Sequence, residues 1–135
     1  MGASLPRLLL VEDDSDHARV TAVGLGVEGF DVEVAHSADA ALKLMAANSF
    51  DVAVVDLMLP GTNGIQLARM IRERHSDTRI VLTSAYHLSE RQLHRVDCGA
   101  VGFVPKPFDL TELARFLRSK LVGEQRLAAS PGAAA

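Results

Sequence analysis

Charged and hydroxyl-bearing side chains follow four of the five short apolar segments in this sequence of 135 residues. They are Glu12 and Asp13 after the first segment, Asp56 after the third, Ser84 after the fourth and Lys106 after the fifth. The carboxyl ends of parallel strands lie along one edge of a sheet, and ligands bind there, near the point where the strand order reverses. The spacing therefore predicts one polar site assembled from distant parts of the chain.

These residue types indicate metal-assisted phosphoryl chemistry. Carboxylates that converge repel one another unless a cation lies between them, and an oxygen-only ligand set favours Mg²⁺ or a similar hard cation. One of these carboxylates can attack phosphorus and form an acyl phosphate. The Lys106 ammonium and the Ser84 hydroxyl can then hold phosphoryl oxygens.

The segments that must position these side chains alternate between strand and helix patterns. Apolar runs at 8–11, 32–35, 52–55, 80–82 and 101–104 predict five strands. Amphipathic patterns predict helices over 15–28, 38–47 and 65–74, and two more that begin near 89 and 109. Asp14 and Ser37 are expected helix caps, and 89–92 and 109–112 read as capping boxes. This alternation predicts an α/β sandwich with helices on both faces of a parallel sheet.

The length fits one domain, which we expect over residues 7–122, between a short extension at 1–6 and a tail or linker at 123–135. We expect no second domain after residue 122, so the chain either acts alone through protein contacts or is the corresponding part of a longer protein. The five histidines show no ligand spacing and are expected on the surface: His17, His36, His75, His87 and His94.

Composition excludes several classes of protein. The net charge of −3 argues against a nucleic-acid-binding surface. The single cysteine, Cys98, excludes an internal disulfide and fits a reducing compartment. No apolar run approaches the roughly 20 residues of a membrane span, and residues 1–6 lack a signal-peptide pattern. We therefore expect a cytoplasmic protein that contacts neither nucleic acid nor membrane through this domain.

The sequence resembles the CheY-like receiver domains of bacterial two-component response regulators. The resemblance covers residues 7 to about 122, and its motifs are Val11-Glu12-Asp13-Asp14, Asp56-Leu57-Met58-Leu59-Pro60 with Gly64, Thr83-Ser84-Ala85 and Lys106-Pro107-Phe108. It implies a flavodoxin-like (βα)₅ fold with strand order 2-1-3-4-5.

The resemblance also implies a metal site and a phosphorylation site. Glu12 and Asp13 match the acidic pair that binds Mg²⁺, with Asp13 as the direct ligand. Asp56 matches the phosphorylated aspartate and a further metal ligand. Met58 occupies the position that supplies a backbone carbonyl to the metal. Lys106, which precedes a cis proline in the family, matches the lysine that pairs with the phosphoryl group.

Two further residues match the family's switch. Ser84 corresponds to the hydroxyl residue that bonds the phosphoryl group, and Phe103 corresponds to the switch aromatic. Thr83 is an alternative to Ser84, because strand alternation lets only one of the two face the site; the spacing to Lys106 favours Ser84. The family more often has Thr and Tyr at these two positions, so a switch through Phe103 must act by packing alone.

Three other functions compete with this interpretation. One is a receiver-like docking module that works without phosphorylation. Another is a metal-dependent phosphohydrolase with an aspartyl-phosphate intermediate, but its second acid, two residues after the nucleophile, is here Met58. A flavin-binding module is the third, and the acids after the first strand would repel a flavin phosphate.

The resemblance also implies partners. The phosphoryl donor is expected to be a sensor histidine kinase or a phosphotransfer protein, in a single transfer or a phosphorelay. A downstream protein, or an output domain outside this sequence, is expected to read the conformation, and dimerisation on phosphorylation is left open. The only catalysis expected is that of the domain's own phosphorylation and dephosphorylation.

Overall fold

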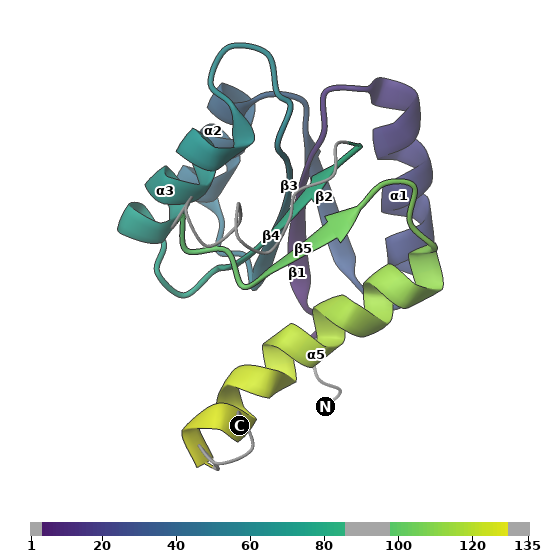
Figure 1. Cartoon of the computed structure of the whole chain (residues 1–135), viewed down its shortest axis with the longest axis vertical. Helices are drawn as coiled ribbons and strands as arrows, with labels where there is room; N and C mark the ends of the chain where they lie inside the picture. Colours follow the sequence, from purple (N-terminus) through teal and green to yellow (C-terminus); the bar gives the residue numbers. More distant parts are fainter. Residues whose placement is uncertain (1–3, 86–97, 130–135) are drawn as a thin grey trace.

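The computed structural model describes residues 4–85 and 98–129, and these residues form five strands and four helices (Figure 1). The strands are β1 (Arg7–Val11), β2 (Asp31–Ala35), β3 (Val52–Asp56), β4 (Arg79–Ser84) and β5 (Gly102–Pro105). They form one parallel sheet in the order β2-β1-β3-β4-β5, which confirms the predicted topology. The strand order reverses at β1 and β3, the two strands that carry the acids.

The register brings the polar strand ends together. Val11 pairs with Val55, so Glu12 and Asp56 occupy equivalent positions on neighbouring strands. Asp56 in turn pairs with Thr83. The fourth strand is longer than predicted and includes Thr83 and Ser84 rather than ending before them.

The described helices are α1 (Ser15–Val27), α2 (Ala38–Ala47), α3 (Gly64–Arg74) and α5 (Leu110–Ala129). Three of these four described helices begin at the predicted caps, and α3 begins after Asn63, a cap that was not predicted. Asp14 caps α1, Ser37 caps α2, and Asp109 accepts a hydrogen bond from the Glu112 amide at the start of α5. The capping box predicted at 89–92 and its helix lie outside the described residues. The domain boundary that we expect after residue 122 falls inside α5 and stays a prediction.

Strand alternation divides the core into two layers. One layer packs under α2 and α3, and the other under α1 and α5. The strand residues of the first layer include Leu9, Val11, Ala53, Val55 and Leu82, and those of the second include Leu8, Leu10, Val52, Val54 and Val81. Because helices cover both faces, the interiors of β1, β3 and β4 are apolar and these strands become polar only at their ends, whereas the edge strand β2 alternates and exposes Glu33.

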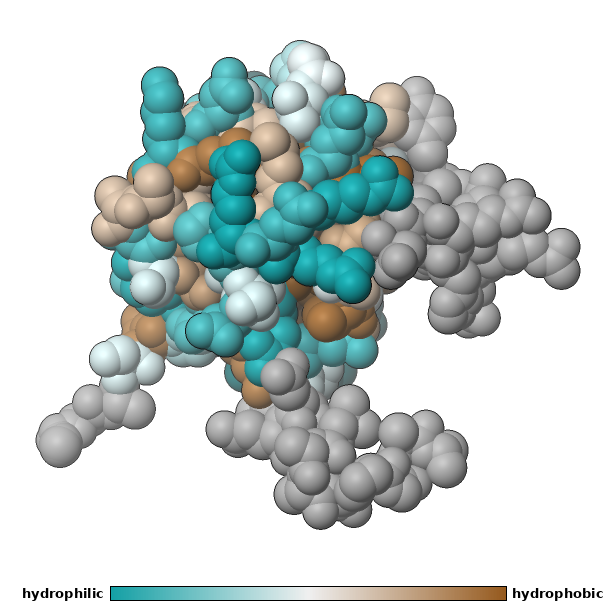
Figure 2. All heavy atoms as spheres, turned by 90° about the vertical axis from the view of Figure 1, so that its left-hand side faces the viewer, coloured by the Kyte–Doolittle hydropathy of each residue, from teal (hydrophilic) through white to brown (hydrophobic). Residues whose placement is uncertain are grey.

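The outer surface on the side of α2 and α3 is mostly hydrophilic (Figure 2). Arg69, Arg72, Glu73 and Arg74 are exposed on α3, while Leu67, Ala68 and Ile71 face the sheet. The polar side chains that remain buried are therefore informative, and among the described residues they include Glu12, Asp56, Thr83 and Ser84.

Candidate functional site

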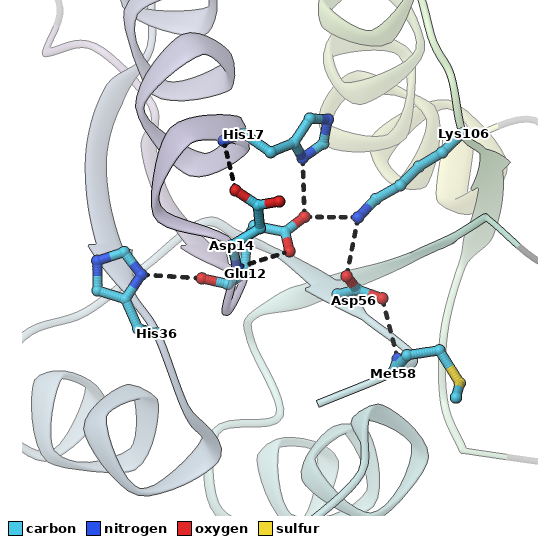
Figure 3. Close-up of polar contacts among 7 residues, drawn as sticks. All are labelled: Glu12, Asp14, His17, His36, Asp56, Met58 and Lys106. Atoms are coloured by element: carbon cyan, nitrogen blue, oxygen red, sulfur yellow. Dashed lines mark hydrogen bonds and ion pairs between the residues drawn. The ribbon is translucent and has the colours of Figure 1, made fainter. Parts of the chain in front are cut away.

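The side chains of Glu12, Asp56 and Lys106 meet at the carboxyl edge of the sheet (Figure 3). Lys106 follows β5, and its Nζ lies 2.8 Å from Asp56 Oδ2 and 2.5 Å from Glu12 Oε1. These two contacts join Lys106 to residues that lie 94 and 50 positions earlier in the chain. The predicted convergence of three strand ends is therefore correct.

Asp56 is 6% exposed, and each of its two carboxylate oxygens accepts a hydrogen bond. Lys106 binds Oδ2, and the Met58 amide donates to Oδ1 at 2.9 Å. The backbone at Asp56 is fixed by Gly64, the first residue of α3, whose amide donates to the Leu57 carbonyl at 3.0 Å. A Cβ at Gly64 would lie 2.3 Å from the Asp56 carbonyl oxygen, so only glycine lets α3 approach this closely.

Glu12 is 3% exposed and accepts hydrogen bonds on both side-chain oxygens. Its Oε1 contacts Lys106 Nζ and also His17 Nδ1, at 2.8 Å. Its Oε2 accepts from the Asp14 amide at 3.2 Å. The backbone carbonyl of Glu12 contacts His36 Nδ1 at 2.9 Å. A buried carboxylate needs such partners because water no longer solvates it.

Asp13 is exposed and completes a group of three carboxylates with Glu12 and Asp56. One oxygen from each of the three lies within 4.8 Å of the others. This arrangement fits a small hard cation, because several carboxylate oxygens in such proximity repel one another without one. The Met58 amide contacts Asp56, and its side chain is directed away from the carboxylates (Figure 3); the role of its carbonyl as a metal ligand stays a prediction.

Lys106 is the cation that pairs with two of these acids, Glu12 and Asp56. Burial lowers the pKa of its ammonium, but hydrogen bonds from the ammonium to Asp56 and Glu12, and the negative charges of these two residues, outweigh burial. The net result is a pKa above the ordinary value for lysine. Lys106 is therefore a permanent cation at neutral pH. The Lys106–Pro107 bond is cis, as the resemblance implied.

The two hydroxyl candidates lie on opposite faces of the sheet. Thr83 is the register partner of Asp56. Leu82 belongs to the core layer under α2 and α3, and Ser84, two residues further along the same strand, faces the same side. Leu82 is the register partner of Phe103, which packs partly buried against that same layer. Ser84 and Phe103 thus share one face, and Thr83 and Ser84 are both buried.

Two histidines contact Glu12, which the sequence analysis did not predict, although His36 is exposed as expected and the His17 side chain is 37% exposed. His17 contacts the Glu12 side chain, and His36 contacts its backbone. His36 directly follows β2, so the strand-end rule that selected the acids would also have selected it. His17 lies in the first turn of α1, and its contact with Glu12 depends on how that helix sits above the sheet.

Comparison with known proteins identifies the family. The family model of the response regulator receiver domain matches residues 8–118. This chain belongs to that family. Receiver domains are the regulatory domains of two-component signalling, and the chain is accordingly a signalling domain of that kind.

Relatives of this receiver domain include complete response regulators and isolated receiver domains. It is 36% identical over 116 residues to the response regulator MprA of Mycobacterium ulcerans, an alignment that covers 85% of this chain and 50% of MprA. A CheY-like receiver domain protein of Methanospirillum hungatei superposes with a TM-score of 0.83 at 26% identity, over 91% of this chain and 98% of that one.

A third relative was crystallised with Mg²⁺-BeF. The response regulator protein TrrA of Thermotoga maritima, in complex with Mg²⁺-BeF, superposes with a TM-score of 0.77 at 28% identity, over 87% of this chain and 99% of that one. The receiver domain spans about half the length of several curated relatives that it matches. No helix within residues 4–85 and 98–129 is both long and apolar enough to cross a membrane.

Proposed function

We propose that this receiver domain is a phosphorylation switch in which Asp56 accepts a phosphoryl group from a histidine kinase or a phosphotransfer protein. The observation that carries the proposal is the Lys106 ammonium, which bridges Asp56 and Glu12 beside a group of three carboxylates. A structural ion pair needs one acid, whereas three acids and one lysine leave net negative charge that suits Mg²⁺. The cation and Lys106 together would then offset the negative charge of an incoming phosphoryl group.

Asp56 is the nucleophile of this proposal. One carboxylate oxygen attacks phosphorus as the bond from phosphorus to the donor imidazole nitrogen breaks, and the electron pair of that bond stays on the nitrogen. Glu12, Asp13, Asp56 and the Met58 carbonyl would hold Mg²⁺, which would supply charge neutralisation for the phosphoryl oxygens. After the transfer, the Lys106 ammonium pairs with an oxygen of the phosphoryl group. The domain thereby promotes its own phosphorylation without acting on a separate substrate.

The competing functions explain less of the site. A docking module that is never phosphorylated has no use for three clustered carboxylates with a lysine between two of them. A phosphohydrolase requires an acid two residues after Asp56, and Met58 offers only its backbone there. A flavin phosphate would meet Glu12 and Asp13 after β1, which repel it.

The direct test is phosphorylation by a small donor. Acetyl phosphate or phosphoramidate with Mg²⁺ should add one phosphoryl group to the chain, detected by intact-mass spectrometry, and Asp56→Asn should abolish the addition. Asp51→Asn is the matched control, because Asp51 lies at the other end of the same strand, where it accepts a bond from the Arg7 amide. A phosphoryl group that persists in Asp56→Asn contradicts the proposal.

We further propose that Ser84 and Phe103 carry the signal from Asp56 to the surface formed by β5 and α5. When the Ser84 hydroxyl bonds a phosphoryl oxygen, the end of β4 moves inward, and Phe103, which packs on the same face, fills the space behind it. One hydrogen bond to a charged acceptor supplies about 1.5–3 kcal/mol, a roughly 10- to 150-fold shift between two conformations. The surface that responds includes a hollow lined by Phe103, Pro105, Pro107, Phe108, Leu113 and Phe116.

Three alanine variants test this path. Ser84→Ala and Phe103→Ala should still be phosphorylated at Asp56 but should lose the hydrogen-exchange response of β5 and α5. Thr83→Ala is the control, since Thr83 lies on the other face of the sheet, and it should respond as wild type does. If Thr83→Ala loses the response and Ser84→Ala keeps it, the hydroxyl role belongs to Thr83. The surface residues that we expect to join this readout, Tyr86, His87, Arg91, His94 and Arg95, lie outside the described residues.

The partners follow from the chemistry of the switch. We propose a histidine kinase or phosphotransfer protein as donor, and a protein target or an output domain as the reader, with dimerisation as one form of output. Support for an output domain comes from the longer relatives, one of which is named a transcriptional regulatory protein. The proposed location is the cytoplasm, with which the single, buried Cys98 agrees.

A further inference from the structure

We propose that His17 is a positioning residue of the metal site, which holds the Glu12 carboxylate in place when Lys106 leaves it for the phosphoryl group. The inference rests on the proposed function, because it assumes that Glu12 serves Mg²⁺ and that Lys106 serves the phosphoryl group. It adds a role for a residue of α1 that the family resemblance did not assign.

Glu12 Oε1 is shared by two donors. Lys106 Nζ and His17 Nδ1 both contact this oxygen, at 2.5 and 2.8 Å (Figure 3). An ionised carboxylate can only accept hydrogen bonds, so the imidazole proton lies on Nδ1. The second ring nitrogen of His17 faces away from Glu12 (Figure 3). His17 is thus a donor dedicated to Glu12, whereas Lys106 divides its ammonium between Glu12 and Asp56.

The shared oxygen explains why a second donor matters. The proposed phosphorylation draws Lys106 toward the new phosphoryl charge, and Glu12, only 3% exposed, then loses a donor that water cannot replace. Within the described residues, the remaining hydrogen bond to its side chain would be that from the Asp14 amide to the other oxygen, Oε2. Because His17 stays on Oε1, the carboxylate keeps its orientation toward the metal throughout the reaction.

The ring of His17 is itself held in place from two elements. Its backbone amide donates to the Asp14 side chain that caps α1, at 3.1 Å. The ring lies 5.6 Å from that of Phe108, centroid to centroid, at an interplanar angle of 56°. Phe108 follows Lys106 by two residues, so the imidazole sits between α1 and the segment that carries the lysine. The side chain is 37% exposed, so it contributes little to the hydrophobic core.

The expected effect is a loss of metal affinity rather than a loss of fold. Removing a hydrogen-bond partner of a ligating carboxylate typically weakens metal binding by about 10- to 100-fold. His17→Leu removes the donor and should raise the Mg²⁺ dissociation constant by that factor. His17→Asn places an amide nitrogen near the position of Nδ1 and should restore most of the affinity.

The experiment titrates the full chain with Mg²⁺ alone, and then with Mg²⁺ and beryllofluoride, followed by NMR and by melting temperature. Circular dichroism without metal checks that each variant is folded, and His17→Met is a second donor-free variant if leucine disturbs the contact with Phe108. His75→Leu is the matched control, because His75 ends α3 at the opposite edge of the sheet, and it should bind as wild type does. The loss in His17→Leu should be larger with beryllofluoride, since Lys106 has then left Glu12.

The outcomes separate this inference from the proposed function. If wild type binds neither Mg²⁺ nor beryllofluoride, the proposed function fails. If wild type binds both and His17→Leu binds as tightly, His17 has no positioning role. Equal losses in His17→Leu and His17→Asn would assign the effect to ring packing and overturn the role as donor. If the loss of Mg²⁺ affinity in His17→Leu is no larger with beryllofluoride than without it, the proposed movement of Lys106 away from Glu12 is overturned.

Discussion

The two edges of the sheet carry similar charges in different surroundings. At the carboxyl edge, Lys106 pairs with Glu12 and Asp56, whose side chains are only 5% and 8% exposed. At the opposite edge, Arg7 pairs with Asp31 at 3.4 Å and Glu33 at 3.9 Å, and these acids are 55% and 46% exposed. Both edges thus have one basic residue between two acids, and burial is the main difference.

Burial decides what each group of charges can do. Solvent screens the pairs around Arg7, and exposed ion pairs of this kind contribute about 0–1 kcal/mol each. Glu12 and Asp56 are removed from water, so their charges depend on the few partners that the site provides. A change in those partners, by a metal ion or a phosphoryl group, therefore has large consequences only at the carboxyl edge.

The largest contrast is expected between Lys106→Ala and Arg7→Ala. Loss of the Lys106 ammonium removes one charge-assisted contact to a phosphoryl group, which corresponds to about 1.5–3 kcal/mol or a roughly 10- to 150-fold weaker affinity for beryllofluoride. NMR shifts on adding beryllofluoride should then no longer reach Ser84 and Phe103. Arg7→Ala should leave these shifts unchanged. If Lys106→Ala responds to beryllofluoride as wild type does, Lys106 has no role in binding the phosphoryl group.

A second contrast concerns metal binding. Mg²⁺ that binds only the folded chain should stabilise it by about 1.4 kcal/mol at ten times the dissociation constant, measured as a rise in melting temperature. Asp13→Asn should remove most of this stabilisation, whereas Asp31→Asn at the other edge should keep it. Without metal, Asp13→Asn should be slightly more stable than wild type, because it relieves repulsion with Glu12 and Asp56. A melting curve that does not respond to millimolar Mg²⁺ would argue against the metal site.

The smallest effect is a dependence of stability on alkaline pH. The folded-state pKa of Lys106 is raised, so its contribution is complete below the unfolded-state pKa, about 10.4, and is lost as the pH rises through the higher folded-state value. In metal-free protein, the stability difference between wild type and Lys106→Met should therefore shrink only above that pH. Denaturant melts of the two proteins over this range measure it, and a difference that already shrinks near neutral pH would contradict the raised pKa.

The sheet and much of the site could be predicted because the ends of buried strands can be recognised in a sequence. Each buried strand is a short apolar run, and a charged residue directly after it must lie at the edge. Glu12, Asp56 and Lys106 were found in this way. The caps at Asp14, Ser37 and Asp109 were predicted instead from polar residues that precede helical patterns.

What could not be predicted depends on the distances between elements. His17 reaches Glu12 only because α1 sits over the end of β1, and nothing in its sequence neighbourhood indicates this. Gly64 reads as a loop glycine, yet its role is to let α3 touch the backbone of Asp56. Which of Thr83 and Ser84 shares a face with Phe103 follows from the pairing of Leu82 with Phe103, a register that the sequence alone does not contain.

The chain order of the site has a consequence for folding kinetics. All three carboxylates belong to the first 56 residues, while Lys106 joins them across separations of 50 and 94 residues. Contacts between distant residues close late, because the intervening chain must first be ordered. We expect Lys106→Ala to accelerate unfolding and to leave the refolding rate nearly unchanged, as a chevron plot would reveal. The lysine would then govern how long the assembled domain persists rather than how fast it forms.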